Sequence, residues 1–167
     1  AIDTGDATTC TTIGSKDQRG VTRPQGAACD IGAYETGAVI PVVTASNPSA
    51  GATLTSLSSI TVIFNQDMLD NATADGAENV DNYILVERGA NGSFNTVSCN
   101  GGLVSDDVKQ TISTASYSSA GFITSLTLAS PLAAGTYRLF VCGTTSIWSA
   151  AGLELDNGAS DYTVDFT

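Results

Sequence analysis

The chemistry that this chain can offer starts with five acidic side chains in one short polar segment: Asp67, Asp70, Asp75, Glu78 and Asp81. Hard oxygen ligands in a flexible loop are what Ca²⁺ requires, so this segment is a candidate calcium site. The spacing does not follow the EF-hand pattern. A solvated acidic loop that keeps the protein soluble explains the same residues and is the preferred interpretation. A second oxygen-rich loop, with Glu154, Asp156 and Asn157, carries the same two interpretations.

Catalysis is not expected, because the sequence contains no histidine. This excludes Ser/His/Asp and Cys/His arrangements as well as imidazole metal ligands. A Ser–Lys pair would need Lys16 or Lys109 to be desolvated beside a serine. The adjacent carboxylates Asp106 and Asp107 would point to opposite faces of a strand, and in a turn we expect them to be solvated, so they do not make a glycosidase pair. Lys109 is also a candidate for an isopeptide crosslink, although a surface lysine is the preferred interpretation.

Four cysteines occur as two pairs along the chain, Cys10 with Cys29 and Cys99 with Cys142. Three connectivities exist for four cysteines, and the local pairing is favoured because each pair lies within one expected structural unit. In the chain-entropy model, closing these loops would stabilise the fold by about 3 and about 4 kcal/mol. Four free thiols are the alternative, and no Cys-x-x-Cys motif supports zinc. Disulfides imply an oxidising compartment, so we expect an extracellular or cell-surface protein.

The formal net charge of −11 limits the partners. An acidic surface repels phosphate backbones and anionic lipids, so we expect no nucleic-acid binding. No apolar run approaches the roughly 18 residues of a membrane helix, so no membrane insertion is expected. Trp148 is the single tryptophan, and Tyr117, Phe122 and Tyr137 are expected in the core, which disfavours a carbohydrate-binding platform. No signal peptide is visible, as expected of a mature, processed chain, although a trimmed chain would look the same.

Short runs of β-branched and aromatic residues predict the elements that would position these side chains. The expected strands are Val39–Ala45, Ile60–Asn65, Asn82–Glu87, Thr111–Tyr117, Phe122–Leu128, Thr136–Cys142 and Asp161–Phe166. Alternation is clear where Tyr137, Leu139 and Val141 share one face. About seven short strands separated by turn signals predict an all-β fold, a β-sandwich. Only the stretch from Met68 to Asn79 is expected to hold a helical turn.

The order of these elements resembles the bacterial Ig-like domains of the SbsA type, which occur in surface-layer proteins and secreted adhesins. The resemblance rests on NPSAGATLTSLSSITVIFNQDM (47–68), DNYILV (81–86), LTLASPLAAGTYRLFVCG (126–143) and SAAGLELDNGASDYTVDFT (149–167). It implies an Ig-like β-sandwich over residues 42–167, after a linker at 37–41. Residues 88–110 are longer than this pattern requires, and a disulfide from Cys99 to Cys142 would be a local elaboration.

The N-terminal residues carry a second resemblance. Residues 17–35, DQRGVTRPQGAACDIGAYE, resemble the last coil and C-terminal signature of secreted right-handed parallel β-helix proteins. AIDTGD (1–6) resembles the strand that opens such a coil. This implies a β-helix-type coil, or connector, at residues 1–36. A single coil cannot bury its own faces, so it is expected to pair with its sandwich, a longer β-helix or another subunit. The candidate assembly residues are Ile2, Ile13, Ile31 and Tyr34.

Two functions follow from this organisation. The preferred hypothesis is a non-enzymatic structural subunit of a bacterial surface filament or similar extracellular assembly. It would form a homopolymer by β-strand addition from residues 1–36 to another copy. The alternative is an Ig-like adhesin or spacer domain at the C-terminus of a larger secreted β-helix protein. No cofactor is expected apart from the candidate calcium.

Overall fold

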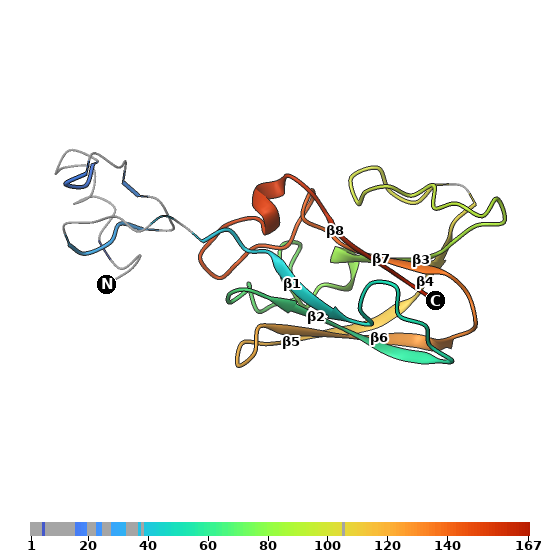
Figure 1. The fold of residues 1–167 in the computed structure, drawn as a ribbon. Coiled ribbons are helices and arrows are strands. Elements are labelled where there is room, and N and C mark those ends of the chain that lie inside the picture. The colour runs from blue at the N-terminus through green and yellow to red at the C-terminus, as the bar shows by residue number, and fades with distance from the viewer. Residues whose placement is uncertain are drawn as a thin grey trace.

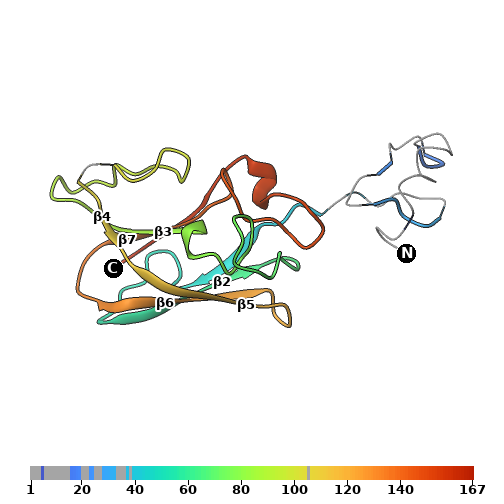
Figure 2. The same cartoon turned by 180° about the vertical axis from the view of Figure 1, so that it is seen from behind.

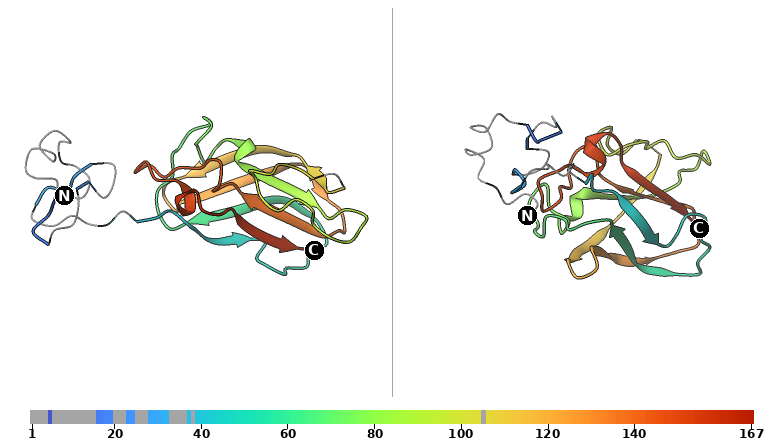
Figure 3. Two further views of the ribbon diagram at one scale, coloured as in Figure 1. Left: turned by 90° about the horizontal axis from the view of Figure 1, so that it is seen from above. Right: turned by 60° about the vertical axis from the view of Figure 1, so that its left-hand side comes forward.

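The fold is a sandwich of two antiparallel sheets. The computed structural model describes residues 5, 16–19, 23–24, 28–32, 37, 39–104 and 106–167. Within these residues, one four-stranded sheet has the order β1-β2-β6-β5 and the other the order β4-β3-β7-β8 (Figure 1). The two sheets lie face to face as two layers, as the views from behind and from above also show (Figures 2 and 3). The predicted all-β, Ig-like sandwich is confirmed.

Each of the seven predicted runs overlaps one strand, although β1, β2, β5 and β6 extend beyond the predicted bounds. The first sheet comprises β1 (Val43–Asn47), β2 (Leu57–Phe64), β5 (Ile112–Ser118) and β6 (Ile123–Leu132). The second comprises β3 (Tyr83–Glu87), β4 (Val108–Gln110), β7 (Tyr137–Val141) and β8 (Tyr162–Phe166). Sequence reasoning missed β4, because a strand of 3 residues is too short to show a period.

The helical turn predicted within residues 68–79 is wrong. The described residues contain two 3-10 helices, η1 (Val80–Asn82) and η2 (Leu155–Gly158). η1 begins just after the predicted segment, because the side chain of Asn79 accepts a hydrogen bond from the N–H of Asp81 at 3.0 Å. No helix in the described part of the chain is long and apolar enough to cross a membrane.

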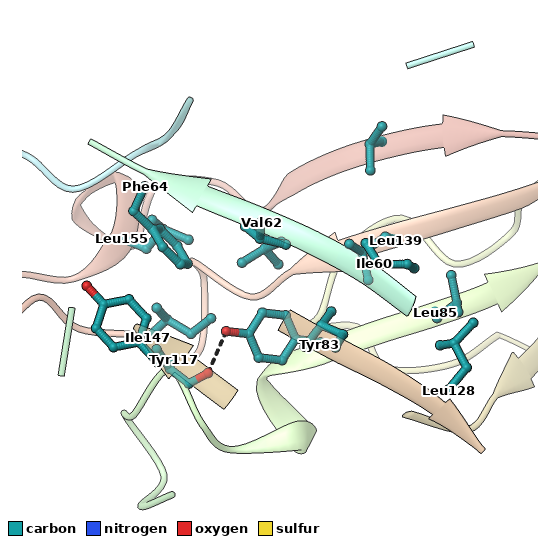
Figure 4. Close-up of a cluster of buried hydrophobic side chains, with 14 of the residues drawn as sticks. Ile60, Val62, Phe64, Tyr83, Leu85, Tyr117, Leu128, Leu139, Ile147 and Leu155 are labelled. Carbon is teal, nitrogen blue, oxygen red and sulfur yellow. Dashed lines mark hydrogen bonds between the residues drawn. The ribbon is translucent and has the colours of Figure 1, made fainter. Parts of the chain in front are cut away.

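The core lies between the sheets and follows the alternation of the strands. In β2 the side chains of Ile60, Val62 and Phe64 are buried, and they pack against residues of the second sheet such as Leu85 and Leu139 (Figure 4). Alternate strand positions point to one face, which is why every second residue of β2 reaches the core. The shared face predicted for residues 137, 139 and 141 is confirmed, since all three belong to this core.

One polar group crosses this apolar layer. The hydroxyl of Tyr83 donates to the carbonyl oxygen of Ala77 at 2.8 Å and contacts Thr124 Oγ1 at 3.2 Å. Burial raises the pKa of Tyr83 far above the ordinary value of a tyrosine. The hydroxyl is therefore a neutral hydrogen-bonding group that links the segment before η1 to β6.

Candidate functional site

The segment between β3 and β4, residues 88–104 together with 106 and 107, covers the outer face of the second sheet (Figure 1). We call this segment the insertion. Val86 and Phe140 lie on that outer face, because Leu85 and Leu139 beside them point into the core. Both are nevertheless fully buried. A side chain on an outer face is shielded from water only when other residues cover it, so the insertion gives this sheet a second buried layer.

Arg138 of β7 joins the insertion to the sheet. Its guanidinium makes a two-point ion pair with Asp165 of β8, at 2.6 Å from Nε and 2.7 Å from Nη2. The same group lies over the ring of Phe94, 4.4 Å from the centroid. The hydrogen bonds to Asp165 raise the pKa of Arg138 above its ordinary value, despite burial. Arg138 therefore acts as a permanently charged contact that holds Phe94 against the sheet.

Asp107 anchors the insertion from its other end, and the expectation of a solvated carboxylate is wrong here. Asp107 is only 5% exposed, and its Oδ2 accepts from the N–H groups of Asn95 at 2.9 Å and Thr96 at 2.6 Å. Burial raises the pKa of Asp107, but hydrogen bonds from Thr96, Asn95 and Gly89 lower it by more, so the pKa lies below its usual value. The neighbouring Asp106 accepts from the Asn95 side-chain amide. Both carboxylates are therefore structural anchors.

The tip of the insertion is fixed by a disulfide. Cys99 is bonded to Cys142, with the Cα atoms 5.6 Å apart, which is the local pairing that the sequence favours. Next to it, Asp161 accepts from the N–H of Cys99 at 2.7 Å. Cys29 is also disulfide-bonded, whereas Cys10 lies outside the described residues.

Aliphatic side chains on the outside of the insertion face solvent. Val97 is 74% exposed, the largest value among the large hydrophobic residues in the described part of the chain. Leu103 and Val104 are exposed as well, and so is Val108 at the start of β4. The N–H of Val104 donates to Thr96 Oγ1 at 3.1 Å, so the two arms of this segment lie side by side. Grouped exposed aliphatic residues are typical of surfaces that contact other molecules.

Two carboxylates of the acidic segment that was a candidate calcium site bind Tyr117 of β5. Asp67 accepts from the hydroxyl of Tyr117 at 2.8 Å, and Glu78 accepts from the Tyr117 N–H at 3.1 Å. Burial, together with the hydrogen bond to Asp67, raises the pKa of Tyr117 to about 12. Asp70 and Asp75 are exposed. Within the described ranges, no three carboxylate or cysteine side chains are placed to hold one metal ion. Calcium binding by this segment stays a prediction.

The remaining candidate residues are dispersed. In the second oxygen-rich loop, the carboxylate of Asp156 accepts a hydrogen bond from the hydroxyl of Ser160. Lys109 is exposed on β4, as a surface lysine is expected to be. Of the candidate assembly residues, Ile31 is 63% exposed, whereas Ile2, Ile13 and Tyr34 lie outside the described residues.

A sandwich of two antiparallel sheets does not by itself define a family, so the family is decided by the sequence. The family model described as a bacterial Ig-like domain matches residues 38–167. The chain belongs to the bacterial Ig-like domain family. The match starts at residue 38, so it does not reach the residues that resemble a β-helix coil. That resemblance, and the boundaries at 36 and 42, stay predictions.

Solved structures with a similar fold come from two kinds of protein. The surface-layer protein SbsC, crystallised as rSbsC(31-844), is 21% identical with a TM-score of 0.47, over 77% of this chain and 14% of that one. Domains 1–6 of SbsC give 21% identity and a TM-score of 0.48, over 78% and 14%. The methionine-rich copper resistance protein PcoC from Escherichia coli is 15% identical with a TM-score of 0.47, over 77% and 98%. No curated protein matches.

These likenesses concern the fold alone. This chain spans about 14% of the length of the first SbsC chain. The anchored insertion, held by Arg138, Asp107 and the disulfide, is the candidate functional site of this domain. The length of this segment and Cys99 stand out in the sequence, whereas the contact made by Phe94 was not predicted. An aromatic residue among glycine, asparagine and serine was the one local signal of a buried contact.

Proposed function

We propose that this bacterial Ig-like domain is a non-enzymatic structural module of an extracellular assembly. The sandwich would be the repeated body, and residues 1–36 the connector to the next copy. The observation that carries the proposal is the path of the chain. Residues 39–42 approach β1 at one end of the sandwich, and β8 finishes at the opposite end (Figure 1). A sandwich that the polypeptide enters at one end and leaves at the other adds length to an assembly.

The disulfides support an extracellular location. The Cys99–Cys142 bond fixes the insertion, and Cys29 is disulfide-bonded as well. Such bonds persist outside the reducing cytoplasm. The bacterial Ig-like family is in keeping with a place at the cell surface.

The use of the polar side chains supports a structural role rather than catalysis. Asp107 and Asp161 hold backbone N–H groups of the insertion, and Arg138 is paired with Asp165. Lys109 is exposed and therefore lacks the desolvated surroundings that a nucleophilic lysine needs. These charged groups of the sandwich and the insertion are thus accounted for by the architecture of the domain.

Assembly would proceed by adding a strand from residues 1–36 of one copy to a sheet edge of the next. Main-chain hydrogen bonds supply the affinity in this mode of recognition. A contact of this kind is head to tail, so it produces an open polymer unless a ring closes.

One observation favours the second candidate, an adhesin or spacer domain of a longer protein. Val97, Leu103 and Val104 expose aliphatic side chains on a segment that is fixed by a disulfide and two carboxylates. A rigid, partly apolar surface of this kind suits binding to another molecule and does not require a polymer.

Light scattering and negative-stain microscopy of the full chain over a range of concentrations test the proposal. Residues 37–167 serve as the comparison, because the core cluster lies entirely within them. Polymers of the full chain that are absent from the shorter chain support a connector. A variant with Val97→Ser, Leu103→Ser and Val104→Ser is the matched surface control, and it should still polymerise. Single chains in every sample contradict the assembly and favour the spacer.

A further inference from the structure

The residues that lead into β1 are held to the sandwich by their backbone. All four carbonyl oxygens from residue 39 to residue 42 accept a hydrogen bond, at 2.9, 2.9, 2.8 and 3.1 Å. The donors are, in the same order, Gln66 Nε2, Asn65 Nδ2, the N–H of Asp156 and the N–H of Asn65. A flexible linker would leave these oxygens to water, so the chain is fixed well before β1 begins.

Asn65 contributes most to this contact, because its side chain acts like a second peptide group. Its Oδ1 accepts from the N–H of Val42 at 3.0 Å, while its Nδ2 donates to the carbonyl of Ile40 at 2.9 Å. Only a side-chain amide offers a donor and an acceptor in this arrangement. Aspartate at this position would keep the acceptor and lose the donor.

The donors come from both layers of the sandwich. Asn65 and Gln66 directly follow β2 of the first sheet, and Asp156 lies in η2, which precedes β8 of the second sheet. Because residues 39–42 are bonded to both sheets, they cannot move with one sheet independently of the other. The side chains of Val39 and Ile40 are 60% and 42% exposed, so the contact is made with main-chain atoms rather than with these side chains.

We propose that Asn65, Gln66 and Asp156 form a main-chain clamp whose ligand is the extended polypeptide that precedes β1. The clamp fixes the direction in which this polypeptide leaves the sandwich. Because it contacts backbone carbonyls, it tolerates changes of side chain at positions 39 and 40. The purpose of the clamp rests on the proposed function, since a connector held at a fixed angle builds a regular assembly. The clamp itself exists within one chain.

Backbone ¹⁵N relaxation of the full chain, at a dilution where light scattering reports single chains, gives the first test. Val39, Ile40 and Val42 carry the N–H groups to observe. Rigid backbone gives order parameters of about 0.85, and flexible backbone gives values below about 0.6. The clamp predicts values for these residues close to those of β2. Values in the flexible range would overturn it.

Three variants separate the parts of the clamp, and they are compared by order parameters and amide exchange. Asn65→Asp should leave the Val42 amide protected but lower the order parameter of Ile40, whose carbonyl loses its donor. Asn65→Ala should lower that order parameter and also expose the Val42 amide to exchange. Loss of one hydrogen bond corresponds to an increase of about five- to tenfold in the exchange rate of the Val42 amide. Gln66→Glu should release only Val39. Asn100→Ala, at an exposed asparagine in the insertion, is the matched control.

Equal exchange and order parameters in Asn65→Asp, Asn65→Ala and the control would overturn the clamp. Unchanged exchange of amides in β2 and β7 shows that each variant is folded. The two proposals also fail separately. If residues 39–42 are rigid but the chain never polymerises, the clamp is supported and the assembly is contradicted. If the chain polymerises while residues 39–42 are flexible, the assembly is supported and the clamp is contradicted.

Discussion

The carboxylate of Asp161 accepts a hydrogen bond from the backbone N–H of Cys99 at 2.7 Å, although the two residues are 62 positions apart. Its other oxygen accepts from the N–H and the hydroxyl of Thr144, at 2.9 and 2.8 Å. One side chain before β8 therefore ties the tip of the insertion to the loop after β7. It does so beside the disulfide from Cys99 to Cys142, so the tip is attached twice.

Removing this carboxylate should destabilise the domain. Asp161→Ala leaves donors of Cys99 and Thr144 without their acceptor, which costs about 1–3 kcal/mol in the free energy of unfolding. Asp161→Asn should cost less, because one acceptor oxygen remains. Urea unfolding measures both variants against Asp70→Ala, an exposed aspartate in the acidic segment. Equal midpoints for Asp161→Ala and Asp70→Ala would contradict this role.

The disulfide should stabilise the whole domain and order the insertion. The bonded cysteines are 43 positions apart, and a loop of that length corresponds to about 4 kcal/mol in the chain-entropy model. The double variant Cys99→Ser/Cys142→Ser tests this more cleanly than a reducing agent, which would also act on Cys29. We expect lower stability in urea and faster amide exchange in residues 88–104. Slow amide exchange in these residues of the variant would show that the carboxylates of Asp107 and Asp161 order the insertion without the disulfide.

Asp107 should make the insertion sensitive to acid. Its folded pKa lies below its usual value, so the ionised form is favoured by folding. The stabilisation is complete above the unfolded pKa of about 3.9 and is lost as the pH falls through the lower, folded pKa. Asp107→Asn should reduce stability at neutral pH and flatten the acid limb of the stability profile. An unchanged acid limb would assign the acid sensitivity to other carboxylates.

The core between the sheets should respond far more strongly than the surface of the insertion. Leu85 is fully buried, so Leu85→Ala should cost about 2–5 kcal/mol. Leu103 is 49% exposed, so Leu103→Ala removes the same atoms and should change stability by no more than about 0.5 kcal/mol. Thermal and urea unfolding of the two variants provide the comparison. A large loss in Leu103→Ala would mean that the insertion packs more tightly than described.

Most of the fold could be predicted because apolar residues alternate with other residues along its strands. Ile60, Val62 and Phe64 alternate in sequence and are buried in the same way. Residues 80–82 were harder to place, because a 3-10 turn depends on one cap. Here that cap is the side chain of Asn79.

The anchors of the insertion could not be predicted from local patterns. Asp107 is next to another carboxylate in the sequence, and this suggests that its side chain is exposed to solvent. Its partners Asn95 and Thr96 come within hydrogen-bonding distance only because the insertion folds back on itself. Asn65 ends the run that was predicted as a strand, and its contact with Val42 spans 23 positions. Such roles depend on contacts between residues that are distant in the sequence, and neither the residue type nor the local spacing reveals these contacts.

The most direct test of the proposed assembly is a capping experiment, followed by mass photometry and negative-stain microscopy. A chain of residues 37–167 keeps the sandwich but lacks the connector, so it should end a polymer in one direction. The account predicts that full-length chains polymerise and that the mean polymer length falls as residues 37–167 are added. Single full-length chains at all concentrations, or polymers whose length ignores the added sandwich, would contradict it.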